Sequence, residues 1–421
     1  MKKSILFLLS LCLIFGVAQK SFASPTEEEQ QAAVDTLKKL MAIYKTDADG
    51  KIVFFDLTDQ VCTNDDLAKI CKLSDVTEAK IYGANLKPGG AEVMKGLAAC
   101  KKLSIENTDF VDADMAVLAE MPWVEELTLR RNTYQGVETL SYVAKMPKLR
   151  NLVLLYGNFN DDAVLQLADV KTLRLLDLRG CSAVTDRGLG VLKELPNLIV
   201  VKLRCTAVTN LGVENVRGKK LKTFDIQDSQ MFDDKAVEIL LEMADSLQEL
   251  TIMRCIALSN EGVKKMTALK NVRRLNLRGN SLGDSGMAGL AGMRDLELVC
   301  LSETYVKDDG MKHLEGMDKI KTLDLWHTKV GDAGLDVIGK LTSLTSLSLM
   351  TTRVTDAGVK KLTGLTNLTH LNLNETSITN ESVETLSQMK SLKTLCVKST
   401  MLTNKGIREL KEALPGCVVE D

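Results

Sequence analysis

One unit of this chain reads LTSLSLMTTRVTDAGVKKL from Leu344 to Leu362, and similar units follow one another about every 24 residues. Each unit begins with an apolar, polar, apolar run that is typical of a short strand. These runs end at Leu57, Ile81, Ile105, Leu129, Leu154, Leu178, Leu203, Ile226, Ile252, Leu277, Leu301, Leu325, Leu349, Leu373 and Val397. A unit this small cannot bury its own apolar side, so neighbouring units must stack and share one core.

The alternation within the strand run predicts which side chains face that core. Successive side chains of a strand point to opposite sides, so Leu347 and Leu349 face inward while Ser346 and Ser348 face outward. The outward positions are not needed for packing. The side chains at these outward positions are therefore free to bind a ligand.

A small polar residue follows the end of most strand runs by three positions. Backbone groups lose their ladder partners there and are half buried, and a hydroxyl or amide can satisfy them. We interpret these residues as a stacked polar column, which comprises Thr108, Asn132, Cys181, Thr206, Ser229, Cys255, Asn280, Thr304, Thr328, Thr352, Thr376 and Thr400.

An Asp or Asn then appears in 13 of the 15 units, often with glycine two residues later. These are favoured N-cap residues, each worth about 1 kcal/mol, and the apolar spacing of Leu189, Leu192 and Leu195 suits a short helix with one buried side. Each unit is therefore predicted to be strand, turn and helix. We interpret the carboxylates as helix caps and not as catalytic groups.

The unit LxxLxLxxT/CxVTDxGLxxLxxL resembles leucine-rich repeats. Its Cys/Thr column is similar to the cysteine-containing subclass found in F-box substrate receptors and in secreted bacterial repeat proteins. The resemblance covers residues 50–415 and implies an α/β fold, a right-handed horseshoe-shaped solenoid of about 15 repeats with a parallel inner sheet and outer helices. It implies a binding scaffold, because this fold serves many functions. The segment before the first strand is too short for an F-box domain.

The 421 residues contain no Pro/Ser/Gly linker that would divide the chain, so one elongated domain is expected. We predict four segments, which are a signal peptide at 1–23, an N-terminal helical cap at 24–50, the solenoid at 51–410 and a C-terminal cap strand at 411–421.

The N-terminus has the pattern of a secretory leader. Lys2 and Lys3 precede an apolar run, and a small-x-small site ends at Ala23, where cleavage is expected. The run is too short to span a membrane. We therefore expect an exported protein, periplasmic, cell-surface or secreted, without a membrane span, and the leader favours a bacterial source.

The cap segment contains Asp47, Asp49 and Gly50, which we interpret as a turn because the remaining ligands of a calcium loop are absent. Cys62 and Cys71 both lie in the first unit, where a disulfide between them stays an open alternative. No Cys or His spacing suggests zinc, so neither a metal nor a cofactor is predicted.

One string resembles the nucleophile elbow of hydrolases. Ser281 lies in a GxSxG sequence from Gly279 to Gly283, between a strand run and a helix pattern. The repeat already explains Asn280 and Leu282 as members of the polar and inward columns. The three histidines lie in other units, so a base within reach is not expected. We predict a protein that is not an enzyme and has no catalytic residues, with a serine hydrolase as an alternative.

The outward positions of the middle units carry an excess of positive charge. The candidate ligand-binding residues of this face are Arg130, Arg131, Tyr156, Arg179, Arg204, Arg254, Arg274, Arg278, Trp326 and His327. Arg179 and Arg204 should be neighbours on adjacent strands, which is unfavourable unless an anion joins them. Two interpretations stay open. Either a ligand supplies that anion, or an internal ladder does so, in which Asp177, Lys202 and Asp225 alternate.

The sequence thus predicts an exported, non-enzymatic and monomeric binding protein whose concave face holds a protein, or alternatively an anionic polysaccharide or peptidoglycan-like polymer. The net charge of −2 and the lack of a continuous basic stripe argue against nucleic acid. A substrate-recognition subunit of a ubiquitin-ligase-like complex and a structural component of the envelope are further alternatives.

Overall fold

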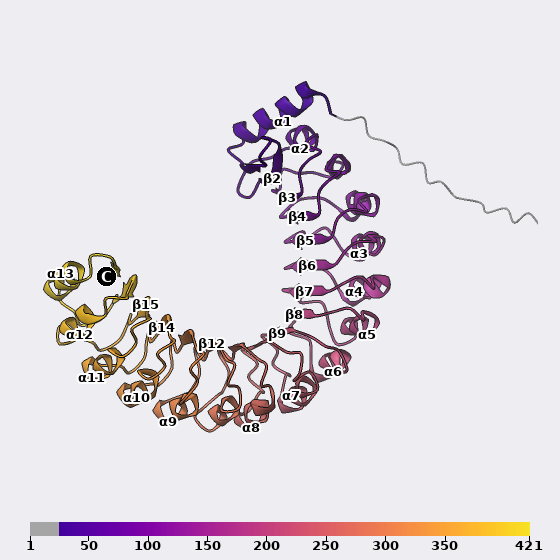
Figure 1. The fold of residues 1–421 in the computed structure, drawn as a ribbon. Helices are drawn as coiled ribbons and strands as arrows, with labels where there is room; N and C mark the ends of the chain where they lie inside the picture. Colours follow the sequence, from indigo (N-terminus) through magenta and orange to yellow (C-terminus); the bar gives the residue numbers. More distant parts are fainter. Residues whose placement is uncertain (1–24) are drawn as a thin grey trace, which may run out of the picture.

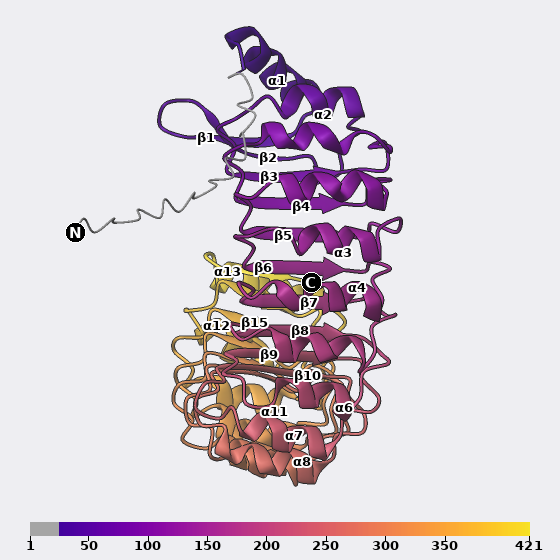
Figure 2. The same ribbon diagram turned by 90° about the vertical axis from the view of Figure 1, so that its right-hand side faces the viewer.

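The computed structural model describes residues 25–421, so the predicted leader lies outside the described residues. The described chain curves into an open horseshoe, with strands along its inner wall and helices along its outer wall (Figure 1). Seen from the side, β3 to β6 are stacked one above another and point the same way (Figure 2). The predicted solenoid architecture is confirmed.

The inner wall is one sheet of 17 strands. β1 is antiparallel to β2, and from β2 to β17 each strand pairs in parallel with the next strand of the chain. The strands are β1 (Ile43–Thr46), β2 (Ile52–Asp56), β3 (Glu78–Tyr82), β4 (Lys102–Glu106), β5 (Glu126–Arg130), β6 (Asn151–Leu155), β7 (Leu175–Arg179), β8 (Val200–Arg204), β9 (Thr223–Gln227), β10 (Glu249–Met253), β11 (Arg274–Asn276), β12 (Leu298–Cys300), β13 (Thr322–Asp324), β14 (Ser346–Ser348), β15 (His370–Asn372), β16 (Thr394–Cys396) and β17 (Val418–Glu420). The predicted strand runs correspond to β2–β16.

The outer wall consists of short helices, because only one or two turns fit between successive strands. The α-helices are α1 (Glu27–Lys39), α2 (Asn64–Ile70), α3 (Val137–Val143), α4 (Asp161–Leu165), α5 (Val191–Glu194), α6 (Asn210–Val213), α7 (Asp234–Leu241), α8 (Asn260–Lys265), α9 (Asp308–Met311), α10 (Leu335–Ile338), α11 (Asp356–Val359), α12 (Ser382–Gln388) and α13 (Asn404–Ala413). The 3₁₀ turns are η1 (Ala91–Gly96), η2 (Asp112–Glu120), η3 (Gln166–Asp169), η4 (Gly188–Gly190), η5 (Glu214–Val216), η6 (Met266–Ala268), η7 (Gly286–Leu290), η8 (Lys312–Leu314), η9 (Asp332–Gly334) and η10 (Lys360–Leu362).

The core lies between the two walls and runs the whole length of the arc. Leu347 and Leu349 are buried as the alternation predicts, whereas Ser346 and Ser348 are half-exposed on the inner face. The same inward slots are filled mostly by Leu, Ile or Val in unit after unit, so each unit buries its apolar side against its two neighbours.

The predicted polar column is confirmed in most units. The Thr304 hydroxyl donates to the Leu301 carbonyl at 2.6 Å, and the Asn132 amide donates to the Ile105 carbonyl at 2.7 Å. Thr206 was assigned wrongly, because it is exposed. Its unit is one residue shorter at this point, so the buried Cys205 takes the column position and its thiol contacts the Leu178 carbonyl at 3.3 Å.

The Asp/Asn column does not cap helices in the way the sequence predicts. Asp332 reaches across to the next unit, where its Oδ1 accepts from the Thr355 backbone N–H at 2.8 Å and its Oδ2 accepts from the Thr355 hydroxyl at 2.7 Å. Thr355 itself is the N-cap of α11. Asp356 repeats this pattern with Thr379. The carboxylates therefore tie successive units together, although Asp233 does cap its own helix α7.

The recurring glycine makes room for that carboxylate. A Cβ atom on Gly334 would lie 2.8 Å from Asp308 Oδ1 and 2.9 Å from Val330 Cγ1. The Gly334 N–H also donates to Asp308 Oδ1 at 2.9 Å. Where a side chain does occupy this position, as in Thr139, its hydroxyl donates to the Asp of the preceding unit. The motif Asp-x-Gly is thus explained by packing between units.

The two ends of the core are covered differently. At the N-terminal end α1 buries Ala33 and Leu37, and the sequence did not predict β1, which adds an antiparallel strand beside β2. Asp47 Oδ1 accepts from the backbone of Asp49 and Lys51, which forms the turn between β1 and β2. At the other end β17 forms the last strand, and α13 extends to Ala413, inside the predicted terminal segment 411–421.

The nine cysteines in the described part of the chain are free thiols. Cys62 and Cys71 are both buried free thiols, so the described residues contain no disulfide between them. Burial raises the pKa of the Cys62 thiol to about 12. The six buried cysteines act as small apolar side chains of the core.

Candidate functional site

Most of the candidate residues lie in one row at the C-terminal ends of neighbouring strands on the inner face. We call this set the rim row, and it comprises Arg130, Arg131, Tyr156, Arg179, Arg204, Asp228, Arg254, Arg278, Glu303, Trp326 and His327. The row follows β5 to β13 around the middle of the horseshoe (Figure 1). Arg274 does not belong to it, because it lies at the other end of β11, 3.8 Å from Glu249.

Backbone conformation places part of the rim row. Arg131, Tyr156, Arg254 and His327 have φ values of 53°, 54°, 51° and 54°, in the left-handed region that non-glycine residues rarely adopt. In most units the next residue enters the buried polar column, so this conformation lets one side chain stay at the rim while the following one turns inward. The same position in three other units is glycine, namely Gly83, Gly180 and Gly279.

Two of those glycines lie against side chains of the rim row. A Cβ atom on Gly180 would collide with the ring of Tyr156, and one on Gly279 would collide with the Arg254 side chain. The ring and the Arg254 side chain therefore each lie directly over a glycine of the following unit. This contact limits their movement and holds them at the rim.

A chain of contacts joins the first half of the row. The Arg131 guanidinium lies 5.8 Å from the centroid of the Tyr156 ring, and Arg204 Nη1 donates to the Tyr156 hydroxyl at 3.2 Å. Arg204 also pairs with Asp228, and Asp228 pairs with Arg254 as well. One carboxylate thus holds two guanidinium groups that come from different units.

A second group of contacts joins the other half. Arg278 Nε donates to Glu303 Oε2 at 2.8 Å, and the Arg278 guanidinium lies 4.7 Å from the centroid of the Trp326 ring. The rings of Trp326 and His327 are 6.3 Å apart. The candidate patch of Trp326 and His327 is therefore continuous with the arginines.

The register between β7 and β8 makes Arg179 and Arg204 direct neighbours, as predicted. Internal carboxylates neutralise them. Arg179 Nη2 lies 2.7 Å from Asp177 Oδ2, and Arg179 Nη1 lies 4.0 Å from Asp225 Oδ2. Asp177, Lys202 and Asp225 are adjacent across the three strands. Of the two interpretations that the sequence left open, the geometry is that of the internal ladder.

The pKa values of the carboxylates on this face are shifted in opposite directions. The hydrogen bond from Arg254, with that from Arg204, lowers the pKa of Asp228. The hydrogen bond from Arg278 likewise lowers the pKa of Glu303. Burial instead raises the pKa of Asp225, which outweighs its hydrogen bond from Gln227.

Arg130, at the first strand of the rim row, pairs with Glu106 at 3.3 Å on the preceding strand. The sequence interpretation missed Glu303, which it did not name among the opposing charges. Its position in the repeat could have identified it. Glu303 directly precedes the polar column residue Thr304, as Arg254 precedes Cys255.

The residues around Ser281 have structural roles in the repeat. Asn280 donates to the Ile252 and Leu277 carbonyls at 2.7 Å each, and its Oδ1 accepts from the Cys255 N–H. Ser281 itself is exposed on the following turn. Within residues 25–421, no helix combines the length and the apolar character that crossing a membrane requires.

Comparison with known proteins places the fold. A family model described as "Leucine Rich repeat" matches residues 268–291, 340–362 and 364–387. No curated protein sequence matches the chain. Among solved structures, an internalin from Listeria monocytogenes is similar with a TM-score of 0.50 and 18% identity, over 96% of this chain and 99% of that chain.

Two further structures are similar. A leucine-rich repeat protein from Leptospira interrogans has a TM-score of 0.44 and 17% identity, over 84% of this chain and 92% of that one. A TLR13–ssRNA13 complex has a TM-score of 0.51 and 14% identity, over 83% of this chain and 56% of the other, so this chain spans little more than half of it. Identities this low concern the fold alone.

Proposed function

The chain is a leucine-rich repeat protein, and we propose that it is an exported, non-enzymatic binding protein that holds a protein ligand against the rim row of its concave face. The observation that carries the proposal is the contact chain from Arg131 through Tyr156, Arg204 and Asp228 to Arg254. Aromatic and arginine side chains are the types enriched at the centres of protein interfaces.

The contacts within the row support this proposal because they fix side chains that would otherwise be flexible. Arg204 and Arg254 share Asp228, and Arg278 is held between Glu303 and the Trp326 ring. Side chains fixed before binding lose less conformational entropy when a partner docks. A row that is already ordered is therefore suited to a specific ligand.

The charge pattern favours a protein over a polyanion at this face. Asp228 and Glu303 already neutralise the arginines beside them, and their lowered pKa values keep both carboxylates ionised at neutral pH. A polyanion would have to displace these carboxylates. A protein surface that presents groups of both signs can complement the row as it stands.

Export is supported by the leader pattern of Lys2, Lys3 and the site ending at Ala23. The non-enzymatic part of the proposal is supported by the role of Asn280, because the central residues of the GxSxG string serve the polar column and the core. A Ser281→Ala variant that lost a hydrolytic activity of the wild type would contradict this part.

The test is capture and cross-linking of ligands by the tagged protein from the envelope fraction of its own cells. We expect a Tyr156→Ala/Trp326→Ala double variant to lose the captured protein, because it removes both aromatic anchors. Tyr305→Ala is the matched control, since Tyr305 is 58% exposed but follows the buried Thr304, beyond the rim row. A ligand that survives the double variant and is lost with Tyr305→Ala would show that the rim row is not the site.

A further inference from the structure

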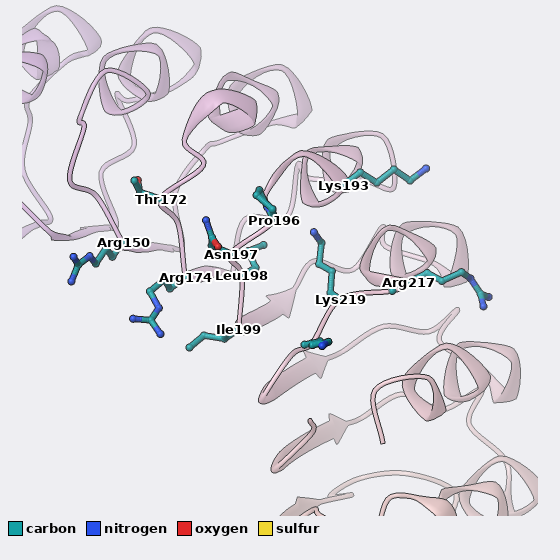
Figure 3. Close-up of a pocket in the computed structure, with 12 residues that line it drawn as sticks. Arg150, Thr172, Arg174, Lys193, Pro196, Asn197, Leu198, Ile199, Arg217 and Lys219 are labelled. Carbon is teal, nitrogen blue, oxygen red and sulfur yellow. The ribbon is translucent and has the colours of Figure 1, made fainter. Parts of the chain in front are cut away.

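A cavity of about 920 Å³ lies at the opposite ends of the strands, where the chain enters β6 to β9. Six of the twelve residues that line it are cationic and none is acidic (Figure 3). We call it the basic cleft, and its cationic residues are Arg150, Arg174, Lys193, Arg217, Lys219 and Lys220.

The backbone places Arg150 and Arg174 side by side. The residues that directly precede successive strands are hydrogen-bonded to one another in order. The Arg174 N–H donates to the Arg150 carbonyl at 2.7 Å, the Ile199 N–H donates to Arg174 at 2.9 Å, and the Lys222 N–H donates to Ile199 at 2.8 Å. Like charges on adjacent strands repel each other. Between Glu125 and Glu297 no acidic residue occupies this column to relieve the repulsion.

Elsewhere on the same edge some cations have a carboxylate partner one unit away. Lys102 pairs with Glu126 at 3.5 Å, and Lys321 pairs with Glu297 at 2.9 Å. Arg150 at one end of the cleft still has Glu125 at 3.5 Å.

The central cations of the cleft have no such partner. In the part of the chain that the structure describes, no carboxylate lies within 4.0 Å of Arg174, Lys219 or Lys220. Lys219 instead donates to the Leu195 carbonyl at 2.8 Å, and burial lowers its pKa. The centre of the cleft therefore carries cations whose charge no neighbouring carboxylate neutralises.

The close-up shows which side chains can act together. Arg150 and Arg174 extend in the same direction, away from the helices, whereas Lys193 and Arg217 point outward on the helical side (Figure 3). Pro196 is exposed and Ile199 is half-buried between the charged groups. The ligand that fits this arrangement carries several oxyanions and also has some apolar surface.

We propose that the basic cleft is a second binding site, separate from the rim row, and that it takes an acidic polysaccharide with sulfate or carboxylate groups. The guanidinium groups suit planar pairing with such oxyanions, and Pro196 and Ile199 offer a surface for the C–H face of a sugar ring. No aromatic residue lines the cleft, so it lacks the platform on which single-stranded nucleic acids stack their bases. Inorganic polyphosphate has no apolar face to cover Pro196.

The test measures binding of fluorescein-labelled heparin, a sulfated polysaccharide, by fluorescence anisotropy. The variant is Arg174→Glu/Lys220→Glu, because both residues are exposed and neither has an ion pair whose loss would disturb folding. We expect heparin to bind at least about tenfold more weakly to it. We also expect wild-type binding to weaken between about 50 and 200 mM NaCl.

The control is Lys390→Glu/Lys393→Glu, which changes the net charge equally at two exposed positions near the C-terminal end of the solenoid. Heparin binding should survive in this control and in the Tyr156→Ala/Trp326→Ala variant, which tests the rim row separately. Circular dichroism melts establish that each variant folds. Equal loss in both charge variants would show that net charge alone attracts heparin. Unchanged binding in Arg174→Glu/Lys220→Glu, or tighter binding of polyphosphate or single-stranded DNA than of heparin, would overturn the proposal.

Discussion

At the scale of single residues, the environment of each carboxylate decides how it contributes to the inner face. Asp225 and Asp228 are three positions apart in the chain, yet burial raises the pKa of the first and two arginines lower the pKa of the second. Asp228 is therefore stabilised in its charged form by the fold, and Asp225 is not. The same residue type thus has opposite effects on stability.

We predict that Asp228→Asn lowers the free energy of unfolding at neutral pH by about 1–2 kcal/mol, since it leaves Arg204 and Arg254 without a shared acceptor. Because the folded pKa of Asp228 is lowered, its contribution is complete above its unfolded pKa of about 3.9 and is lost as pH falls through the folded value. The difference between wild type and variant should therefore vanish in acid. Urea denaturation at a series of pH values measures it.

Asp225→Asn is the matched control for this prediction. Its folded pKa is raised, so the charged form costs stability above that pKa, and the cost is relieved as pH falls through it. The variant should be neutral or more stable at neutral pH. If both substitutions destabilised equally at every pH, the difference between the two environments would be refuted.

At the scale of elements, the unit is defined as much by its contacts with its neighbours as by its own strand and helix. Asp308 accepts hydrogen bonds from the Gly331 and Gly334 N–H groups of the following unit, at 2.7 and 2.9 Å. A side chain at Gly334 would occupy the space of that carboxylate. The Asp and Gly columns therefore act together, across the boundary between units.

We predict that Gly334→Ala destabilises the protein by about 2 kcal/mol, because the new Cβ displaces the Asp308 carboxylate from two backbone donors. Thermal denaturation followed by circular dichroism measures the change. Gly190→Ala is the control, since Gly190 also lies in a helical turn but has no atom within 4 Å of its Cβ position. It should be neutral or slightly stabilising. Equal effects of the two substitutions would contradict the packing argument.

At the scale of the whole molecule, the horseshoe is a linear array in which each unit contacts its neighbours and little else. The two ends of such an array carry exposed core surface unless they are covered. α1 covers the first units with Leu37, which is fully buried, and α12 and α13 close the other end. Local damage is therefore expected to have local effects.

We predict that Leu37→Ala accelerates amide hydrogen exchange in α2 and β2–β4 and leaves α10–α13 unchanged, because the lost core contacts are not shared by distant units. The matched substitution Leu386→Ala, in the buried side of α12, should have the reverse distribution. Mass spectrometry of peptides after exchange measures both. A uniform acceleration along the chain in either variant would show that the array unfolds as one cooperative body.

The amino-acid sequence alone was sufficient to predict the parallel sheet, the outer helices, the inward leucines and most of the polar column. These features follow from alternation and spacing within one unit, and local geometry translates them directly into structure. The strand ends from Leu57 to Val397 were predicted for this reason. The error at Thr206 arose because that unit is one residue shorter, which shifts the column to Cys205.

Only the tertiary structure decided which side chains neutralise the arginines, which carboxylates link neighbouring units and where charges stay unpaired. Arg204 contacts Asp228, which lies 24 residues away along the chain, and Tyr156, which lies 48 residues away along the chain. Such partners come together only when the register of each strand on the next is fixed. The sequence position of a carboxylate is the same whether it caps its own helix or accepts hydrogen bonds from the next unit. The stacking of the units decides which of the two it does.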